Sequence, residues 1–127
     1  MASFKTIQNP TFSADVLIPR VGGDPVKVQF EFRYLSRLEI AALFDKWNAA
    51  RADLGKAAKK ADITWQQATT GQVDFEVQQF KDIVVGWELD DELTDEFIAG
   101  LLASCMGVSE VIVSAFQEAH GNARRGN

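Results

Sequence analysis

The feature that most constrains the fold of this chain is a strict alternation of apolar and polar residues from Val26 to Tyr34. The apolar members are Val26, Val28, Phe30, Phe32 and Tyr34. A period of two is typical of a strand with one buried face. A shorter alternation spans residues 12–18, and the turn residues Gly22 to Pro25 lie between the two runs. Together they predict an antiparallel hairpin with one apolar face.

A lone hairpin is marginally stable in water, so helices are expected to cover its apolar face. The first helix is predicted to begin after Ser36, which has the spacing of a capping box with Glu39. Gly55 is a stop signal, so this helix is expected to end near Asp53. Its apolar stripe consists of Ile40, Leu43, Phe44 and Trp47.

Residues 54–71 have no continuous apolar face, and we interpret them as a mobile connection with one helical turn at most. Trp65 is the exception in this polar segment, and two interpretations stay open. It could anchor a partner, because aromatic residues are enriched at contact hot spots. Alternatively, it folds back as a lid over the core of its own domain.

The second helix is predicted to open at Phe75 or Val77, with Gly86 as its terminator. A group of carboxylates follows, namely Glu88, Asp90, Asp91, Glu92, Asp95 and Glu96. They are bunched and have no glycine at a sharp turn, so they lack the pattern of a calcium loop. They flank the start of the next helix, where carboxylates interact favourably with the positive helix N-terminus. No metal site is predicted.

Two further helices complete the pattern. Thr94 is the predicted N-cap of the third, Gly107 ends it, and Ser109 is the predicted N-cap of the fourth. Gly121 is the expected stop of the fourth helix. The sequence therefore predicts one α+β domain over residues 1–127, an N-terminal antiparallel β-hairpin packed against about four α-helices.

Length and composition narrow the function classes. A chain of 127 residues fits one domain, and its ends, residues 1–11 and 122–127, are expected to be flexible. The net charge of −5 argues against a nucleic-acid partner. No apolar signal run follows Met1, and no stretch has the ~20 apolar residues of a membrane span, so no membrane partner is expected. The single cysteine, Cys105, fits a reducing cytoplasm.

Charge is unevenly distributed along the chain. Residues 1–63 carry ten Lys and Arg against seven Asp and Glu, a net charge of +3, whereas residues 64–127 carry three against eleven, a net charge of −8. A molecule with two oppositely charged parts could stack on copies of itself or on a basic partner. A pattern that serves solubility alone is the other interpretation.

No catalytic or cofactor-binding residue is predicted. A nucleophilic dyad would require Cys105 to reach His120, the one histidine, from another helix. The nine Phe, three Trp and one Tyr are more informative. They either build the core, or they leave one apolar face that closes against another chain.

Three segments resemble those of a known family, and their residues are 28–37, 83–92, and 115–119 with 121–127. The most specific is Val-Val-Gly-Trp followed at once by Glu-Leu-Asp-Asp-Glu. Over most of residues 26–127 the chain resembles the small tail assembly chaperones of long-tailed bacteriophages. The connection from Lys56 to Gln72 is longer than expected for that family.

The resemblance implies a non-enzymatic protein without cofactors. Such proteins bind and solubilise the long, helical tape measure protein in the host cell cytoplasm, and they are absent from the mature virion. Many also exist in a longer form, made by ribosomal frameshifting, that recruits tail tube subunits. The alternative is a structural tail completion or connector subunit.

A coat of this kind needs adaptable apolar contacts with its client and weak contacts between its own copies. We hypothesise that an apolar surface near Trp47, Trp65 or Trp87 makes the client contact or the self-contact. Because the aromatic content of this short chain is high, these three side chains are the protein-contact candidates.

Overall fold

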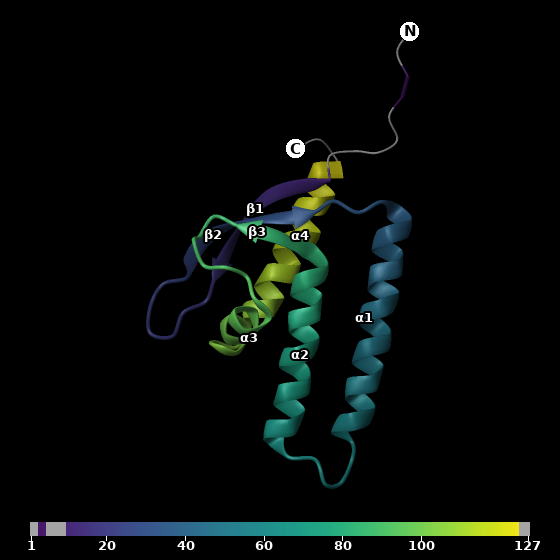
Figure 1. The fold of residues 1–127 in the computed structure, drawn as a ribbon, viewed down its shortest axis with the longest axis vertical. Helices are drawn as coiled ribbons and strands as arrows, with labels where there is room; N and C mark the ends of the chain where they lie inside the picture. Colours follow the sequence, from purple (N-terminus) through teal and green to yellow (C-terminus); the bar gives the residue numbers. More distant parts are fainter. Residues whose placement is uncertain (1–2, 5–9, 125–127) are drawn as a thin grey trace.

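The computed structural model describes residues 3–4 and 10–124 and has the predicted α+β architecture, with one strand more than expected (Figure 1). In chain order its elements are β1 (Thr11–Ile18), β2 (Val26–Arg33), α1 (Arg37–Ala58), α2 (Trp65–Ile83), β3 (Val84–Trp87), α3 (Asp95–Ala103) and α4 (Val108–Arg124). Of the ends predicted to be flexible, Thr11 begins β1 and α4 continues to Arg124. Residues 1–2, 5–9 and 125–127 lie outside the described part of the chain.

The predicted hairpin is confirmed. β1 pairs antiparallel with β2, and its register places Phe12 opposite Phe32 and Val16 opposite Val28. Since side chains alternate between faces, this register gathers the apolar residues of both strands on one side of the sheet. Gly22 in the turn has a φ of 73°, a conformation that favours glycine.

The third strand corrects the sequence analysis, which placed its residues at the end of a helix terminated by Gly86. β3 instead pairs antiparallel with β2, with Phe30 opposite Trp87, so the strand order is β1-β2-β3. A short apolar run fits a helix end and a strand equally well by its pattern. The free edge of β2 decides between them, because it supplies hydrogen-bond partners for the β3 backbone.

Helix α1 begins where predicted. The Oγ of Ser36 accepts a hydrogen bond from the backbone N–H of Glu39, and the Glu39 carboxylate accepts one from the backbone N–H of Ser36. The predicted end near Asp53 was wrong, because the helix passes through Gly55 to Ala58. A glycine inside a helix costs only about 1 kcal/mol, and the packing of half-buried Leu54 against the core offsets it.

The start of α2 was also predicted wrongly. It begins at Trp65 rather than at Phe75 or Val77, after a second capping box. In this box the Oγ1 of Thr64 accepts from the N–H of Gln67 at 3.0 Å, and the Gln67 side chain accepts from the N–H of Thr64 at 2.9 Å.

The mobile connection predicted for residues 54–71 is therefore mostly helical, and only residues 59–64 join α1 to α2. Figure 1 shows why its apolar pattern is weak. The distal halves of the two helices extend past α3 and α4, so they pack on each other without a third layer.

Helix α3 has the predicted N-cap, since the Oγ1 of Thr94 accepts from the backbone N–H of Phe97 at 3.1 Å. Gly107, with a φ of 91°, makes the turn into α4. The predicted cap of α4 was wrong, because Ser109 already lies inside the helix and is buried. The helix also passes through Gly121, its predicted stop.

The core lies between the apolar face of the sheet and the helices. Phe30, Phe32 and Phe116 are fully buried, and Phe12 stacks on Phe116 with ring centroids 6.0 Å apart. α4 packs against β1, α2 lies next to α4, and α1 is the outermost helix, packed mainly against α2 (Figure 1). The fold therefore leaves a long helical hairpin with much exposed surface.

Within the described residues, no single helix is long and apolar enough to cross a membrane. α3 and Val108–Gly121 of α4 reach the required length and composition only as a pair, bent by 105°. Ile98 and Leu102 of α3 and Ile112 and Phe116 of α4 are buried in the core.

Candidate protein-contact surfaces

The three tryptophans singled out in the sequence occupy three different environments. Trp47 on α1 is 3% exposed. Its Nε1 donates a hydrogen bond to Oδ2 of Asp82 on α2 at 2.9 Å. Trp47 is therefore part of the core in this structure, and a partner would not reach it.

Trp87, at the end of β3, is half-buried. Its ring makes edge contacts with Phe30 and Phe97, with centroids 5.7 and 5.6 Å away. Its Nε1 donates to the backbone oxygen of Asp91 at 3.0 Å. Trp87 thus holds the start of the β3–α3 connection against the core.

Trp65 is the exposed member of the three, with 91% of its surface accessible. It is the first residue of α2 and lies where the α1–α2 hairpin turns. The interpretation of Trp65 as a lid over its own core was therefore wrong. Trp65 stays a candidate for a partner contact, because tryptophan is enriched at contact hot spots.

We call residues 56–67 the hairpin tip. Lys56, Lys59 and Lys60 are exposed there, and the described residues offer them no ion-pair partner. A hollow of about 340 Å³ opens beside them, lined by Ala57, Lys60, Asp62, Ile63 and Gln67. With three lysines against one exposed carboxylate, Asp62, the hairpin tip combines a net charge of +2 with exposed apolar surface.

We call residues 88–94, between β3 and α3, the acidic loop. Glu88 is fixed because its Oε1 accepts from the backbone N–H of Gln29 at 2.9 Å. Asp90, Asp91 and Glu92 are exposed and form no ion pair with the described residues. These three carboxylates form a patch of uncompensated negative charge.

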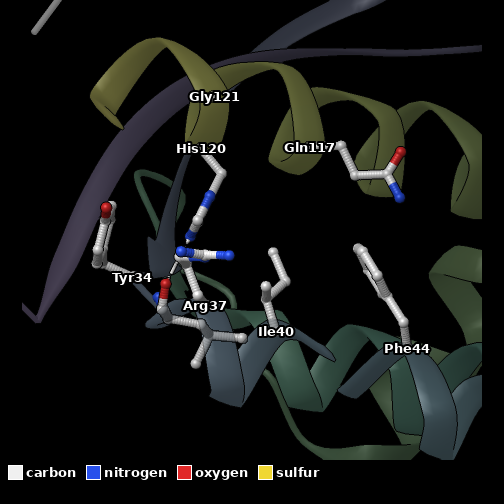
Figure 2. A pocket seen from close by; sticks show the side chains of 8 residues that line it. Tyr34, Arg37, Ile40, Phe44, Gln117, His120 and Gly121 are labelled. Carbon is white, nitrogen blue, oxygen red and sulfur yellow. Dashed lines mark hydrogen bonds between the residues drawn. The ribbon is translucent and has the colours of Figure 1, made fainter. Parts of the chain in front are cut away.

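A groove between α1 and α4 is a further candidate that the sequence analysis missed. Figure 2 shows Ile40 and Phe44 on α1 facing Gln117 and His120 on α4 across an open space. This hollow of about 390 Å³ is lined by Tyr34, Leu35, Arg37, Ile40, Phe44, Gln117, His120 and Gly121. The sequence did contain a signal for this groove. The apolar stripe of α1 includes Ile40 and Phe44, and both side chains stay only half-buried in the fold.

Beside the groove lies a second, more polar hollow of about 440 Å³, and Gln117 lines both. Arg51 of α1, Gln79 of α2 and Glu110 of α4 are among its lining residues. This second hollow lies mainly between α2 and α4, and Arg51 is its lining residue from α1.

Comparison with family models gives a match over residues 1–127, and the matching model describes phage tail assembly chaperones. The chain belongs to the phage tail assembly chaperone family. No curated protein and no solved structure matches it. Family membership confirms the resemblance predicted from the sequence, and it suggests a non-enzymatic role.

His120 has a structural role in this tail assembly chaperone. Its ring stacks on Tyr34 with centroids 4.6 Å apart, and its Nε2 lies 3.0 Å from the backbone oxygen of Leu35. It thereby fastens the β2–α1 linker to α4 at the aromatic end of the groove. Cys105 is half-buried and packs against the core. Among the described residues, the His, Cys, Asp and Glu side chains form no group of three that could hold a metal ion.

Proposed function

We propose that this tail assembly chaperone binds the tape measure protein of its phage and keeps it soluble, with the groove between α1 and α4 holding one helical segment of the client. Family membership and the groove of Figure 2 support this proposal. The groove is the observation that carries it, because it presents apolar side chains without filling the space between the two helices.

The size of the groove suits a short stretch of helix. Along α1 the lining residues extend from Arg37 to Arg51, which at 1.5 Å per residue is about 21 Å, or roughly four helical turns. An amphipathic helix laid in such a groove buries its apolar face through residues three and four apart. Phe44 and Ile40 would contact that face, and the polar end would accept the flank of the helix.

Weak single contacts fit a chaperone that must release its client. A groove with a few apolar side chains and a polar end tolerates many related helices. Many copies along one long client would supply avidity that no single contact has. We further propose that a longer form, made by frameshifting, recruits tail tube subunits, and that the chaperone acts in the host cytoplasm and leaves before the virion is complete.

Matched substitutions on α1 and α4 test the groove by co-expression with the tape measure protein. Gln117 is exposed and lines both hollows, so Gln117→Trp should fill the groove without disturbing the core. Phe44→Asp should repel an apolar helix. Leu38→Asp is the control, because Leu38 is 83% exposed on α1 and lies outside the groove.

We expect wild type and the Leu38→Asp variant to keep the client soluble, and the two groove variants to lose most of this ability. Gln117→Trp should retain the circular dichroism spectrum and the Tm of wild type, whereas Phe44→Asp should lower the Tm, because Phe44 also packs against the core and the Trp47 ring. Equal client solubility with the Gln117→Trp variant would exclude the groove as the client site. Finding the protein in purified mature virions would favour the tail completion or connector alternative.

A further inference from the structure

The second hollow, between α2 and α4, contains a buried amide that has no partner. Gln79 of α2 lines this hollow and is only 4% exposed. Its side-chain amide forms no hydrogen bond with the described residues, and the hollow of about 440 Å³ gives access to it. A buried amide without a hydrogen bond costs free energy. The hollow therefore presents an unused hydrogen-bonding group to a guest.

The polar groups around Gln79 are mainly hydrogen-bond acceptors. Glu76 on α2 and Glu110 on α4 contribute carboxylates, and buried Ser109 contributes a hydroxyl. Neither carboxylate forms an ion pair with a described residue. Glu76 accepts one hydrogen bond, from Nε2 of Gln72 at 3.0 Å. Because a carboxylate can accept several hydrogen bonds, both glutamates keep acceptor capacity for a guest that brings donors.

The charge of the hollow also favours a cationic guest. Of the described residues that line it, Arg51 alone is basic. Its guanidinium lies over the ring of Phe75, 5.5 Å from the centroid, and its Nη1 donates to Oδ1 of Asn48 at 3.3 Å. Arg51 thus neutralises neither carboxylate directly. One arginine against two glutamates gives the lining a net charge of −1, and charged donors form the stronger hydrogen bonds with carboxylates.

We propose that this hollow binds the side chain of a lysine or arginine on the client helix. The inference rests on the proposed function, because the helix that supplies the side chain is the one held in the adjoining groove. Gln117, labelled in Figure 2, lines both the groove and the hollow, so a helix in the groove has the hollow beside it.

A long basic side chain suits the shape and chemistry of the hollow. Its aliphatic stem can pack on Phe75 and Val113, which line the hollow. Its charged head then donates to the carboxylates and to the amide oxygen of Gln79. A metal ion fits less well, because the His, Cys, Asp and Glu side chains of the described part of the chain form no group of three.

Overlapping fluorescent peptides that span the tape measure protein provide the probe, and fluorescence anisotropy measures their affinity for the purified chaperone. We expect the peptides that bind to carry a lysine or arginine beside their apolar face. Replacing this residue by glutamate should weaken binding to wild type about tenfold, because a carboxylate then meets the carboxylates of the hollow.

A charge exchange between chaperone and peptide gives the sharper test. Glu110→Lys should bind the original peptide about tenfold more weakly and should regain affinity for the peptide that carries glutamate. This recovery also shows that the variant is folded. Gln79→Leu removes the amide at similar size, and it should weaken binding of the basic peptide alone. The matched control is Glu118→Lys, because Glu118 is exposed on α4 and lies outside the hollow. It should keep the preference of wild type.

The outcomes separate this inference from the proposed function. Peptides that bind wild type equally well with glutamate in place of the basic residue would overturn the basic side-chain site and leave the groove standing. A Glu110→Lys variant that does not regain affinity for the glutamate peptide would overturn the site as well. Failure of every tape measure peptide to bind wild type would count against the proposed function itself, and the inference would fall with it.

Discussion

Trp47 on α1 and Asp82 on α2 are joined by a 2.9 Å hydrogen bond from the indole Nε1 to Oδ2. Lys46 adds an ion pair to the same carboxylate, with its Nζ 2.9 Å from Oδ1. α1 packs mainly against α2, so this junction fixes the wall of the groove that α1 forms. Trp47 also packs against the ring of Phe44, with centroids 5.9 Å apart, so the candidate client site depends on this part-buried contact directly beneath the groove.

Trp47→Phe should lower the free energy of unfolding by about 1–2 kcal/mol, because it keeps most of the ring but loses a hydrogen bond to a charged group. Lys46→Ala should cost less than about 1 kcal/mol, since the Lys46 side chain is 59% exposed and its ion pair is screened by solvent. Urea denaturation measures both. A larger loss for Lys46→Ala than for Trp47→Phe would contradict this assignment.

Two glycines in the α1–α2 hairpin should respond differently to alanine. A Cβ on Gly55 meets no atom within 4 Å, so Gly55→Ala should stabilise the protein by about 0.5–1 kcal/mol. A Cβ on Gly71 would lie 3.3 Å from Cδ2 of Leu54, so Gly71→Ala should gain less. In a Leu54→Ala background the two gains should become similar. Thermal unfolding of each glycine variant, measured against wild type and against Leu54→Ala, can show this. Equal gains in both backgrounds would refute the close contact.

The capping box of α1 makes a pH prediction. The pKa of the Glu39 carboxyl is lowered because it accepts a hydrogen bond from the Ser36 backbone and, secondly, interacts with the Ser36 side chain. Its contribution to stability is therefore present above the pKa of glutamate in the unfolded chain. It is lost as the pH falls through the lower pKa of the folded state.

Ser36→Ala should destabilise the protein by about 1 kcal/mol at neutral pH. The Tm difference between wild type and a Glu39→Gln variant should shrink as the pH is lowered through the acid range. Differential scanning calorimetry at several pH values measures it, and a difference that does not change with pH would contradict the role of the charged carboxylate.

Gly107 should tolerate substitution poorly. Its φ of 91° lies in the left-handed region, although a Cβ would meet no neighbour there. Gly107→Ala should therefore lower stability by about 1 kcal/mol or more through backbone strain alone. Gly100→Ala is the control, because Gly100 lies inside α3 and is also free of neighbours. Chemical denaturation should show a loss for the first and none for the second.

The strand pairing and the start of α1 were predictable because local patterns decide them. The alternation around Phe30 fixes which face is buried, and Ser36 and Glu39 form their capping box within one turn. The start of α2 was predictable in principle, since Thr64 and Gln67 have the same spacing, but the polar helix that follows shows no apolar stripe. Its exposure beyond the core explains this absence.

Strand β3 and the groove were not predictable from local pattern. Val84 to Trp87 become a strand because β2 offers a free edge. This edge exists only once the tertiary structure has formed. The groove requires Phe44 and Gln117 to face each other across elements far apart in the chain. Among the tryptophans, only the structure separates buried Trp47 from exposed Trp65.

The soluble yield of the tape measure protein, with and without this chaperone, tests the central claim most directly. Co-expression should move most of the tape measure protein from the insoluble to the soluble fraction, and the two proteins should co-purify with several chaperone copies per client. A tape measure protein that stays equally insoluble with and without the chaperone would contradict the account.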